Sequence, residues 1–239
     1  MRGDKILVQA KHHRAAAAIS QILLPRLTNT SGKFAISIGG ESGSGKSELA
    51  VATSEALAKR GIGTLILQQD DYFIYPPHTN DARRREDINR VGPSEVHLAM
   101  LDDHVKAFID GATRIDKPLV VYQDDRIVSE TLPLGKVDVM IVEGTYTTLL
   151  ENVHSRIFID RTYEQTRAAR LKRNREPADS FLERVLQIEH DIISTHKHLA
   201  DIIVTASFTV VRQRSTEGPI DAPTKDRSLS KEVITEGNI

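Results

Sequence analysis

One glycine-rich stretch reads Gly40-Glu41-Ser42-Gly43-Ser44-Gly45-Lys46-Ser47 and matches the pattern G-x-x-x-x-G-K-[ST] at every fixed position. It follows an apolar run at residues 34–38 and precedes a helical pattern at 46–60, the strand–loop–helix context that this motif requires. Glycines let backbone N–H groups turn inward around phosphate oxygens, and the helix directs its positive N-terminal end at the same anion. We predict that residues 40–47 bind nucleotide phosphates, with Lys46 at the β- and γ-phosphates and Ser47 on Mg²⁺.

Apolar strand patterns alternate with helical patterns on both sides of this loop. Strands are expected at residues 34–38, 64–67, 137–142, 156–160 and 201–211, and helices at 12–27, 46–60, 94–110, 164–175 and 180–198. Residues 70–93 are expected to form a long surface loop, and residues 118–128 an extended segment. This alternation favours an α/β fold, a P-loop NTPase three-layer αβα sandwich with a mostly parallel central sheet.

The same patterns divide the chain into three parts. Residues 1–32 are predicted to be an N-terminal helical extension, because Asn29 to Gly32 interrupt the helix before the first strand. Residues 33–211 form the P-loop domain. Residues 212–239 are polar and carry Gly218-Pro219 and Pro223, so we expect a poorly ordered tail there.

The composition excludes several kinds of site and partner. The 239 residues contain no cysteine, which excludes a disulfide scaffold, a Cys-ligated zinc site and a thiol nucleophile, and favours a reducing, cytoplasmic location. No apolar run approaches about 18 residues, so we expect no membrane span. The 32 Lys and Arg against 33 Asp and Glu give a formal charge of −1, which disfavours nucleic acid as the main partner.

A strong strand pattern ends in a single carboxylate. Residues 139–142 are apolar and lead into Glu143-Gly144, so one acidic side chain falls at the strand end beside the expected nucleotide site. The strand lacks the Asp-Glu pair that is common in motor-type ATPases, and the absence of an N-K-x-D stretch, which reads guanine, disfavours a GTPase. We predict that Glu143 organises Mg²⁺ together with Ser47, the alternative being an ordinary solvent-facing strand end.

From about residue 33 to 204 the chain resembles the uridine kinase and phosphoribulokinase group of P-loop kinases. Besides the glycine-rich loop, the resemblance is carried by Gln69-Asp70-Asp71-Tyr72-Phe73, Ile141-Val142-Glu143-Gly144, Arg156-Ile157-Phe158-Ile159-Asp160 and His196-Lys197-His198-Leu199-Ala200-Asp201-Ile202-Ile203. It implies an ATP- and Mg²⁺-dependent kinase that moves the γ-phosphate to a hydroxyl of a small metabolite.

The resemblance also assigns a base. Asp70 matches the family's aspartate after the second strand, which accepts the proton of the acceptor hydroxyl, and it is also a candidate near Mg²⁺. Phosphoryl transfer needs a carboxylate near the attacking oxygen. Asp70 follows the C-terminal end of a strand, which is where open α/β sheets bind their ligands. Asp71 is the alternative, and Tyr72 is a candidate acceptor contact.

A basic helix follows the fourth strand pattern. Arg167, Arg170 and Arg173 recur at a spacing of three and share one helix face. By resemblance, residues 161–180 are the lid, and we expect Arg170 and Arg173 to stabilise the transferring phosphoryl group and Arg167 to lie near substrate. A solvated basic face is the alternative.

The chain departs from uridine kinases where the acceptor is recognised. Val91-Gly92-Pro93 replaces their Asp-His-Pro stretch, and residues 118–126 carry an arginine but no histidine. Arginines at 83–85 suggest an acceptor with a phosphate or carboxylate, and a solubilising surface loop explains them equally well. Candidate acceptor contacts are Tyr72, Arg83, Arg84, Tyr122, Arg126 and Arg167.

Several activities stay open at this point. Uridine or cytidine kinase is the first candidate, and a phosphoribulokinase-like, pantothenate or other sugar or polyol kinase is the alternative. A P-loop regulatory ATPase without a small acceptor is a rival from another class. Whether the chain forms a homo-oligomer stays open as well.

Overall fold

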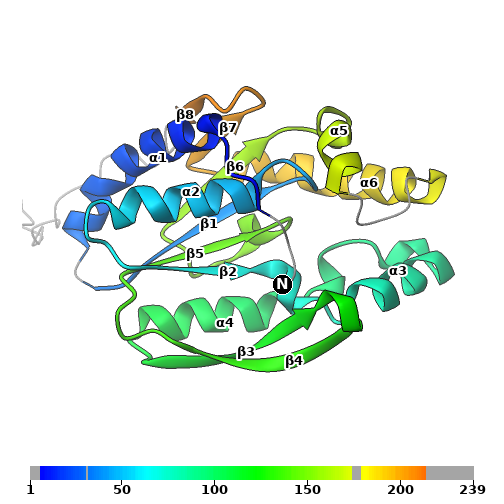
Figure 1. The fold of residues 1–239 in the computed structure, drawn as a ribbon, viewed down its shortest axis with the longest axis horizontal. Coiled ribbons are helices and arrows are strands. Elements are labelled where there is room, and N and C mark those ends of the chain that lie inside the picture. The colour runs from blue at the N-terminus through cyan, green and yellow to red at the C-terminus, as the bar shows by residue number, and fades with distance from the viewer. Residues whose placement is uncertain (1–5, 31, 174–178, 214–239) are drawn as a thin grey trace, which may run out of the picture.

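The computed structural model describes residues 6–30, 32–173 and 179–213, which fold around a six-stranded sheet (Figure 1). In spatial order its strands are β2 (Thr64–Gln68), β5 (Val139–Gly144), β1 (Phe34–Gly40), β6 (Ser155–Asp160), β7 (Ile202–Thr205) and β8 (Val210–Arg212). The first five strands run parallel, and β8 is antiparallel to β7. Helices cover both faces, so the predicted αβα sandwich is confirmed.

Both faces of the central strands are buried, which explains their nearly continuous apolar sequence. Ile36 and Ile141 join a core with α1 and α2 on one face, while Ala35 and Met140 join a second core with α4 on the other. Alternate residues of one strand thus supply two cores. The helices are α1 (Ala10–Asn29), α2 (Lys46–Ala58), α3 (Pro77–Glu86), α4 (Leu98–Ile109), α5 (Tyr163–Arg173) and α6 (Ser180–Ile193).

The N-terminal helix is part of the sandwich. α1 lies along α2 and buries Ala15, Ala16, Ile19 and Leu23 in the core that it shares with the sheet (Figure 1). The segment that the sequence separates as an extension therefore supplies core residues. Within the described residues no helix, α1 with its 20 residues included, is long and apolar enough to cross a membrane.

The prediction of a long surface loop at residues 70–93 is wrong. The segment folds as η1 (Gln69–Tyr72), α3, η2 (Ile88–Arg90) and η3 (Pro93–Glu95). Pro77 occupies the first turn of α3, where its missing N–H and fixed φ suit a helix start. Arg83, Arg84 and Arg85 lie in the last turn, where cations favour the helix dipole.

Two segments each expected to be one extended stretch, residues 118–128 and 201–211, belong to antiparallel pairs of strands instead. The extended segment at 118–128 belongs to a hairpin of β3 (Arg114–Val121) and β4 (Arg126–Pro133), which turns at Asp125 with φ +44°. Residues 201–211 form β7 and β8, which are joined by a turn containing Phe208 at φ +64°. Neither turn carries the glycine that usually marks such a reversal, so the sequence pattern missed both.

One edge of the sheet gathers the polar segments. The glycine-rich loop follows β1, η1 follows β2, Glu143 lies at the end of β5, and Arg161 follows β6. These are the carboxyl ends of neighbouring parallel strands, where ligands bind in open α/β sheets. The sheet order thus brings the predicted nucleotide and catalytic residues to one place.

Candidate active site

The glycine-rich loop has the backbone of a phosphate cradle. Gly43 has φ +72° and Gly45 φ +105°, and Gly45 is the N-cap residue of α2. These left-handed conformations favour glycine, and a Cβ at Gly43 would lie 2.8 Å from Cγ of Arg170. α2 begins at Lys46, so its N-terminal N–H groups lie at the loop. Lys46 Nζ donates to the backbone oxygen of Glu41 at 3.0 Å.

Ser47 and Glu143 form a polar pair below this loop. Ser47 Oγ donates to Glu143 Oε1 at 2.9 Å, and Gln68 Nε2 lies 3.3 Å from the same oxygen. Gln68 and Glu143 are register partners on β2 and β5, so the sheet itself sets this geometry. Burial raises the pKa of Glu143 to about 7, and the charge of Asp70 adds to the rise. A hydroxyl and a buried carboxylate are the hard oxygen ligands that suit Mg²⁺.

The raised pKa of Glu143 predicts a pH-dependent response to Mg²⁺. If Glu143 binds Mg²⁺, a proton competes with the cation for its carboxylate, and apparent Mg²⁺ affinity should fall by about tenfold per pH unit as the pH drops below about 7. Magnesium titrations of ADP release between about pH 5.5 and 8 measure this. Glu143→Gln is the matched control. Protonation of ATP also weakens Mg²⁺ binding at low pH, and it does so equally in both proteins, whereas the glutamine cannot titrate. Equal pH dependence in the two proteins would contradict the assignment.

Asp70 and Asp71 have different surroundings. The carboxylate of Asp71 is buried, receives Lys117 Nζ at 2.7 Å and accepts the backbone N–H of Val120 at 3.0 Å. It therefore fastens η1 to β3. Asp70 is partly exposed, its carboxylate accepts no hydrogen bond from the described part of the chain, and it lines a cavity beside the glycine-rich loop.

That cavity has a volume of about 190 Å³ and lies between η1, α3 and α6. Ser42 of the glycine-rich loop lines it together with Asp70. A small molecule held there would be in reach of both the phosphate loop and a carboxylate. Among its other lining residues are Tyr75, His78, Asp81, Arg84, Tyr122 and Glu189.

The arginines of α3 are engaged by carboxylates of the chain itself. Arg84 donates to both oxygens of Glu95 at 2.7 and 2.8 Å and to Glu189 at 3.2 Å. Burial disfavours its charge, but these partners outweigh burial and raise the pKa of Arg84. Arg85 pairs with Asp81 at 2.8 Å and with Asp179 at 2.9 Å. Arg83 pairs with Glu86 at 3.0 Å and lies over the ring of Tyr75.

Four predicted acceptor contacts are not part of the cavity lining, and Arg83 is one of them. Tyr72 is fully buried in the core beside α4, with its hydroxyl 2.8 Å from Nδ1 of His104. Arg126 is 62% exposed and pairs with Asp124 at 3.1 Å, and Arg167 is 68% exposed and 3.8 Å from Glu183. Tyr122 does line the cavity, where its ring lies 5.2 Å from that of His78.

The segment at 161–170 rests on the glycine-rich loop. Thr166 Oγ1 donates to the backbone oxygen of Ser42 at 2.9 Å, and Arg161 Nη1 donates to that of Ser44 at 3.1 Å. Arg170 bonds Thr166 Oγ1 at 2.6 Å, with its side chain over Gly43. Arg161 was not among the predicted residues, although its place directly after β6 could have marked it. The side chain of Arg173 lies outside the described part of the chain.

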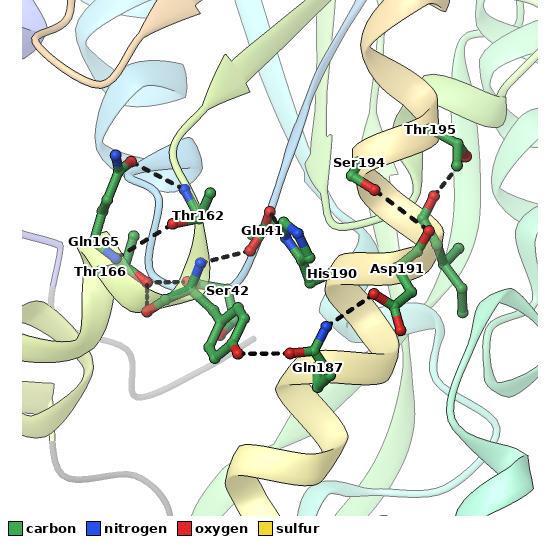
Figure 2. Close-up of polar contacts among 12 residues, drawn as sticks. Glu41, Ser42, Thr162, Gln165, Thr166, Gln187, His190, Asp191, Ser194 and Thr195 are labelled. Carbon is green, nitrogen blue, oxygen red and sulfur yellow. Dashed lines mark hydrogen bonds and ion pairs between the residues drawn. The ribbon is translucent and has the colours of Figure 1, made fainter.

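Glu41 links the loop to two helices (Figure 2). Its Oε2 accepts the backbone N–H of Tyr163 at the start of α5 at 2.5 Å, and its Oε1 lies 2.8 Å from Nδ1 of His190 on α6. The Tyr163 hydroxyl donates to Gln187, one turn before His190, at 2.8 Å. In the sequence Glu41 is a variable position of the motif, and no neighbouring residue indicates its partners.

Fold, loop and cavity together define a P-loop kinase of a small metabolite. A family model described as the phosphoribulokinase / uridine kinase family matches residues 35–203, and the chain belongs to this family. It is therefore an ATP-dependent kinase that acts on a hydroxyl acceptor, as the sequence resemblance implied.

Individual relatives are distant. The chain is 27% identical over 199 residues to the bifunctional alpha-galactosidase/sucrose kinase AgaSK of Mediterraneibacter gnavus, covering 77% of this chain but only 21% of that protein. It is 27% identical to the uridine kinase of Mycoplasma pneumoniae over 71% of this chain and 83% of that one. Phosphoribulokinase of Rhodobacter spheroides superposes with a TM-score of 0.59 at 9% identity, over 74% and 71% of the two chains, which shows a shared fold.

Proposed function

We propose that the protein transfers the γ-phosphate of ATP to a hydroxyl of a small metabolite bound in the cavity between η1, α3 and α6. The observation that carries this proposal is that Ser42 of the phosphate loop and Asp70 line the same cavity. In-line transfer needs the phosphate, the acceptor and a carboxylate within one enclosed volume.

The nucleotide half of the site holds and neutralises phosphates. The amides of residues 40–47 and Lys46 would bind the β- and γ-phosphates, and Ser47 and Glu143 would hold Mg²⁺, with Asp70 near it. Mg²⁺, when bound, supplies charge neutralisation on the phosphate oxygens. Residues 161–180 would act as the lid, with Arg170 and Arg173 stabilising charge on the transferring group.

Asp70 would supply the proton acceptor. As the acceptor oxygen bonds to the γ-phosphorus, the bond from that phosphorus to the bridging oxygen breaks and ADP leaves. The hydroxyl proton passes to the Asp70 carboxylate. Asp71 is poorly suited to this role, because its two oxygens hold Lys117 and Val120.

A coupled ADP-release screen tests the proposal. Candidate acceptors are uridine and cytidine, pentose phosphates, pantothenate, glycerate and free sugars or polyols, classes that include the substrates named for the uridine kinase and sucrose kinase relatives. We expect one class to raise ADP release at least tenfold over the acceptor-free rate. Failure of every compound to raise ADP release would contradict the proposal. The cysteine-free composition leads us to propose a cytoplasmic location.

A further inference from the structure

We propose that the acceptor is uncharged and rich in hydroxyl groups, of the free sugar or polyol type. This inference rests on the proposed function, because it takes the cavity beside Asp70 as the acceptor site. It reverses the expectation of an anionic acceptor that the arginine run at 83–85 had raised.

The charge of the cavity disfavours an anion. Its lining contains the carboxylates of Asp70, Asp81 and Glu189 but one guanidinium, that of Arg84, a formal charge of −3 + 1 = −2 with histidine neutral. The Arg84 guanidinium already bonds Glu189 and both oxygens of Glu95. A phosphate or carboxylate on the acceptor would therefore meet more like charge than opposite charge.

The hydrogen-bonding character of the lining favours a ligand with many O–H donors. Ionised carboxylates accept hydrogen bonds and donate none. The amide of Asn80 and the guanidinium of Arg84 both bond Glu95, and the hydroxyls of Tyr75 and Tyr122 in the same lining can donate as well as accept. Sugar hydroxyls can donate to these carboxylates and also accept from the tyrosine hydroxyls, whereas the carbonyl oxygens of a pyrimidine base can only accept.

Another part of the lining is apolar. The rings of Phe73, Tyr75 and Tyr122 and the aliphatic side chains of Leu182 and Val185 face the same cavity. A sugar ring has C–H faces that pack against such surfaces while its hydroxyls point to polar groups at the rim. The cavity thus offers both surfaces that an uncharged sugar presents.

Matched acceptor pairs test this inference, with acceptor-dependent ADP release as the readout. Each pair sets an uncharged compound beside its phosphate ester or carboxylate: fructose and fructose 6-phosphate, ribulose and ribulose 5-phosphate, pantothenol and pantothenate, glycerol and glycerate; uridine is run beside them. We expect the uncharged sugar or polyol to be used at least tenfold more efficiently than its anion. Preference for an anion or for uridine overturns the inference and leaves the kinase proposal standing. No stimulation by any compound overturns both.

Removing one carboxylate of the lining gives a second test, in which the direction of the change in KM distinguishes an uncharged acceptor from an anionic one. Asp81→Asn should raise KM for an uncharged acceptor about tenfold through loss of a charge-assisted hydrogen bond. For an anionic acceptor the same change should lower KM. Asp110→Asn is the matched control, because Asp110 also makes an i,i+4 ion pair on a helix, with Lys106, but lies away from the cavity.

A second inference stands on a different contact. We infer that Glu41 is a positioning residue that holds α5, and with it Arg170, against the phosphate loop. Its carboxylate is buried, and both oxygens bond groups outside the loop, the N–H of Tyr163 and the ring of His190 (Figure 2). An N–H at a helix start is a favourable partner for an anion, so Glu41 caps α5 from the loop.

Kinetics of three variants test the role of Glu41. Glu41→Ala should lower kcat about tenfold with a smaller change in KM for ATP, because the loop remains but Arg170 is displaced. Glu41→Gln should restore most of kcat, since its amide oxygen still accepts from Tyr163. Gln187→Ala, which removes the acceptor of the Tyr163 hydroxyl and leaves Glu41 in place, should leave kcat near wild type. A Glu41→Ala protein with lower Tm but unchanged kcat, or a Gln variant no better than Ala, overturns the inference.

Discussion

Replacing Asp70 by asparagine is expected to lower kcat by about 10²- to 10⁴-fold, the range that a general base contributes. Asparagine keeps the size of the side chain but cannot take the acceptor proton. KM for ATP should change little, because Lys46 and the loop amides that bind phosphates are untouched. Steady-state ADP release at saturating ATP and acceptor measures the effect.

Asp71→Asn is the matched control for Asp70. It should lower the free energy of unfolding by about 3–5 kcal/mol, because it leaves the buried Lys117 ammonium with a weakened partner. Its kcat per folded molecule should stay within a few-fold of wild type. The opposite pattern, with activity lost in the Asp71 variant and kept in the Asp70 variant, would assign the base to Asp71.

Replacing Lys46 by alanine is the second large expected effect. We expect kcat/KM for ATP to fall by about 10²- to 10³-fold, the cost of removing one charge-stabilising group from a transition state. Lys46 is the first residue of α2 and the one lysine among loop residues 40–47. The measurement is kcat/KM with ATP varied at fixed acceptor.

Lys59→Ala controls for removal of a lysine from the same helix. Lys59 is exposed at the C-cap of α2, far along the helix from the loop, so its loss should leave kcat/KM unchanged. A Lys46→Ala enzyme that retained wild-type kcat/KM for ATP would show that residues 40–47 do not hold the reacting phosphates.

The parts of the site that could be predicted from sequence are those encoded locally. The phosphate loop needs glycine at positions with positive φ and a helix start at Lys46, and both are visible in eight consecutive residues. Glu143 and Asp70 follow from apolar strands that end in carboxylates. The parallel sheet then brings the strand ends together, so their side-by-side placement follows from topology.

The rest depends on contacts between distant segments. Glu41 and His190 are 149 positions apart, and Arg85 and Asp179 are 94 apart, so no window of sequence reveals either pair. The arginine run at 83–85 suggested an anionic acceptor or a solubilising loop, because the carboxylates that bind Arg84 lie on the distant η3 and α6. Tyr72 shows the same limit, since only the packing of α4 directs its ring into the core.

The most direct test of the whole account is the fate of the γ-phosphate, followed by phosphorus NMR with the acceptor that the matched pairs select. We predict that ADP and a phosphate monoester of that acceptor form in equal amounts, with little inorganic phosphate, and that Asp70→Asn abolishes the monoester signal on the same time scale. Formation of ADP with an equal amount of inorganic phosphate, at the same rate with and without acceptor, would contradict the account.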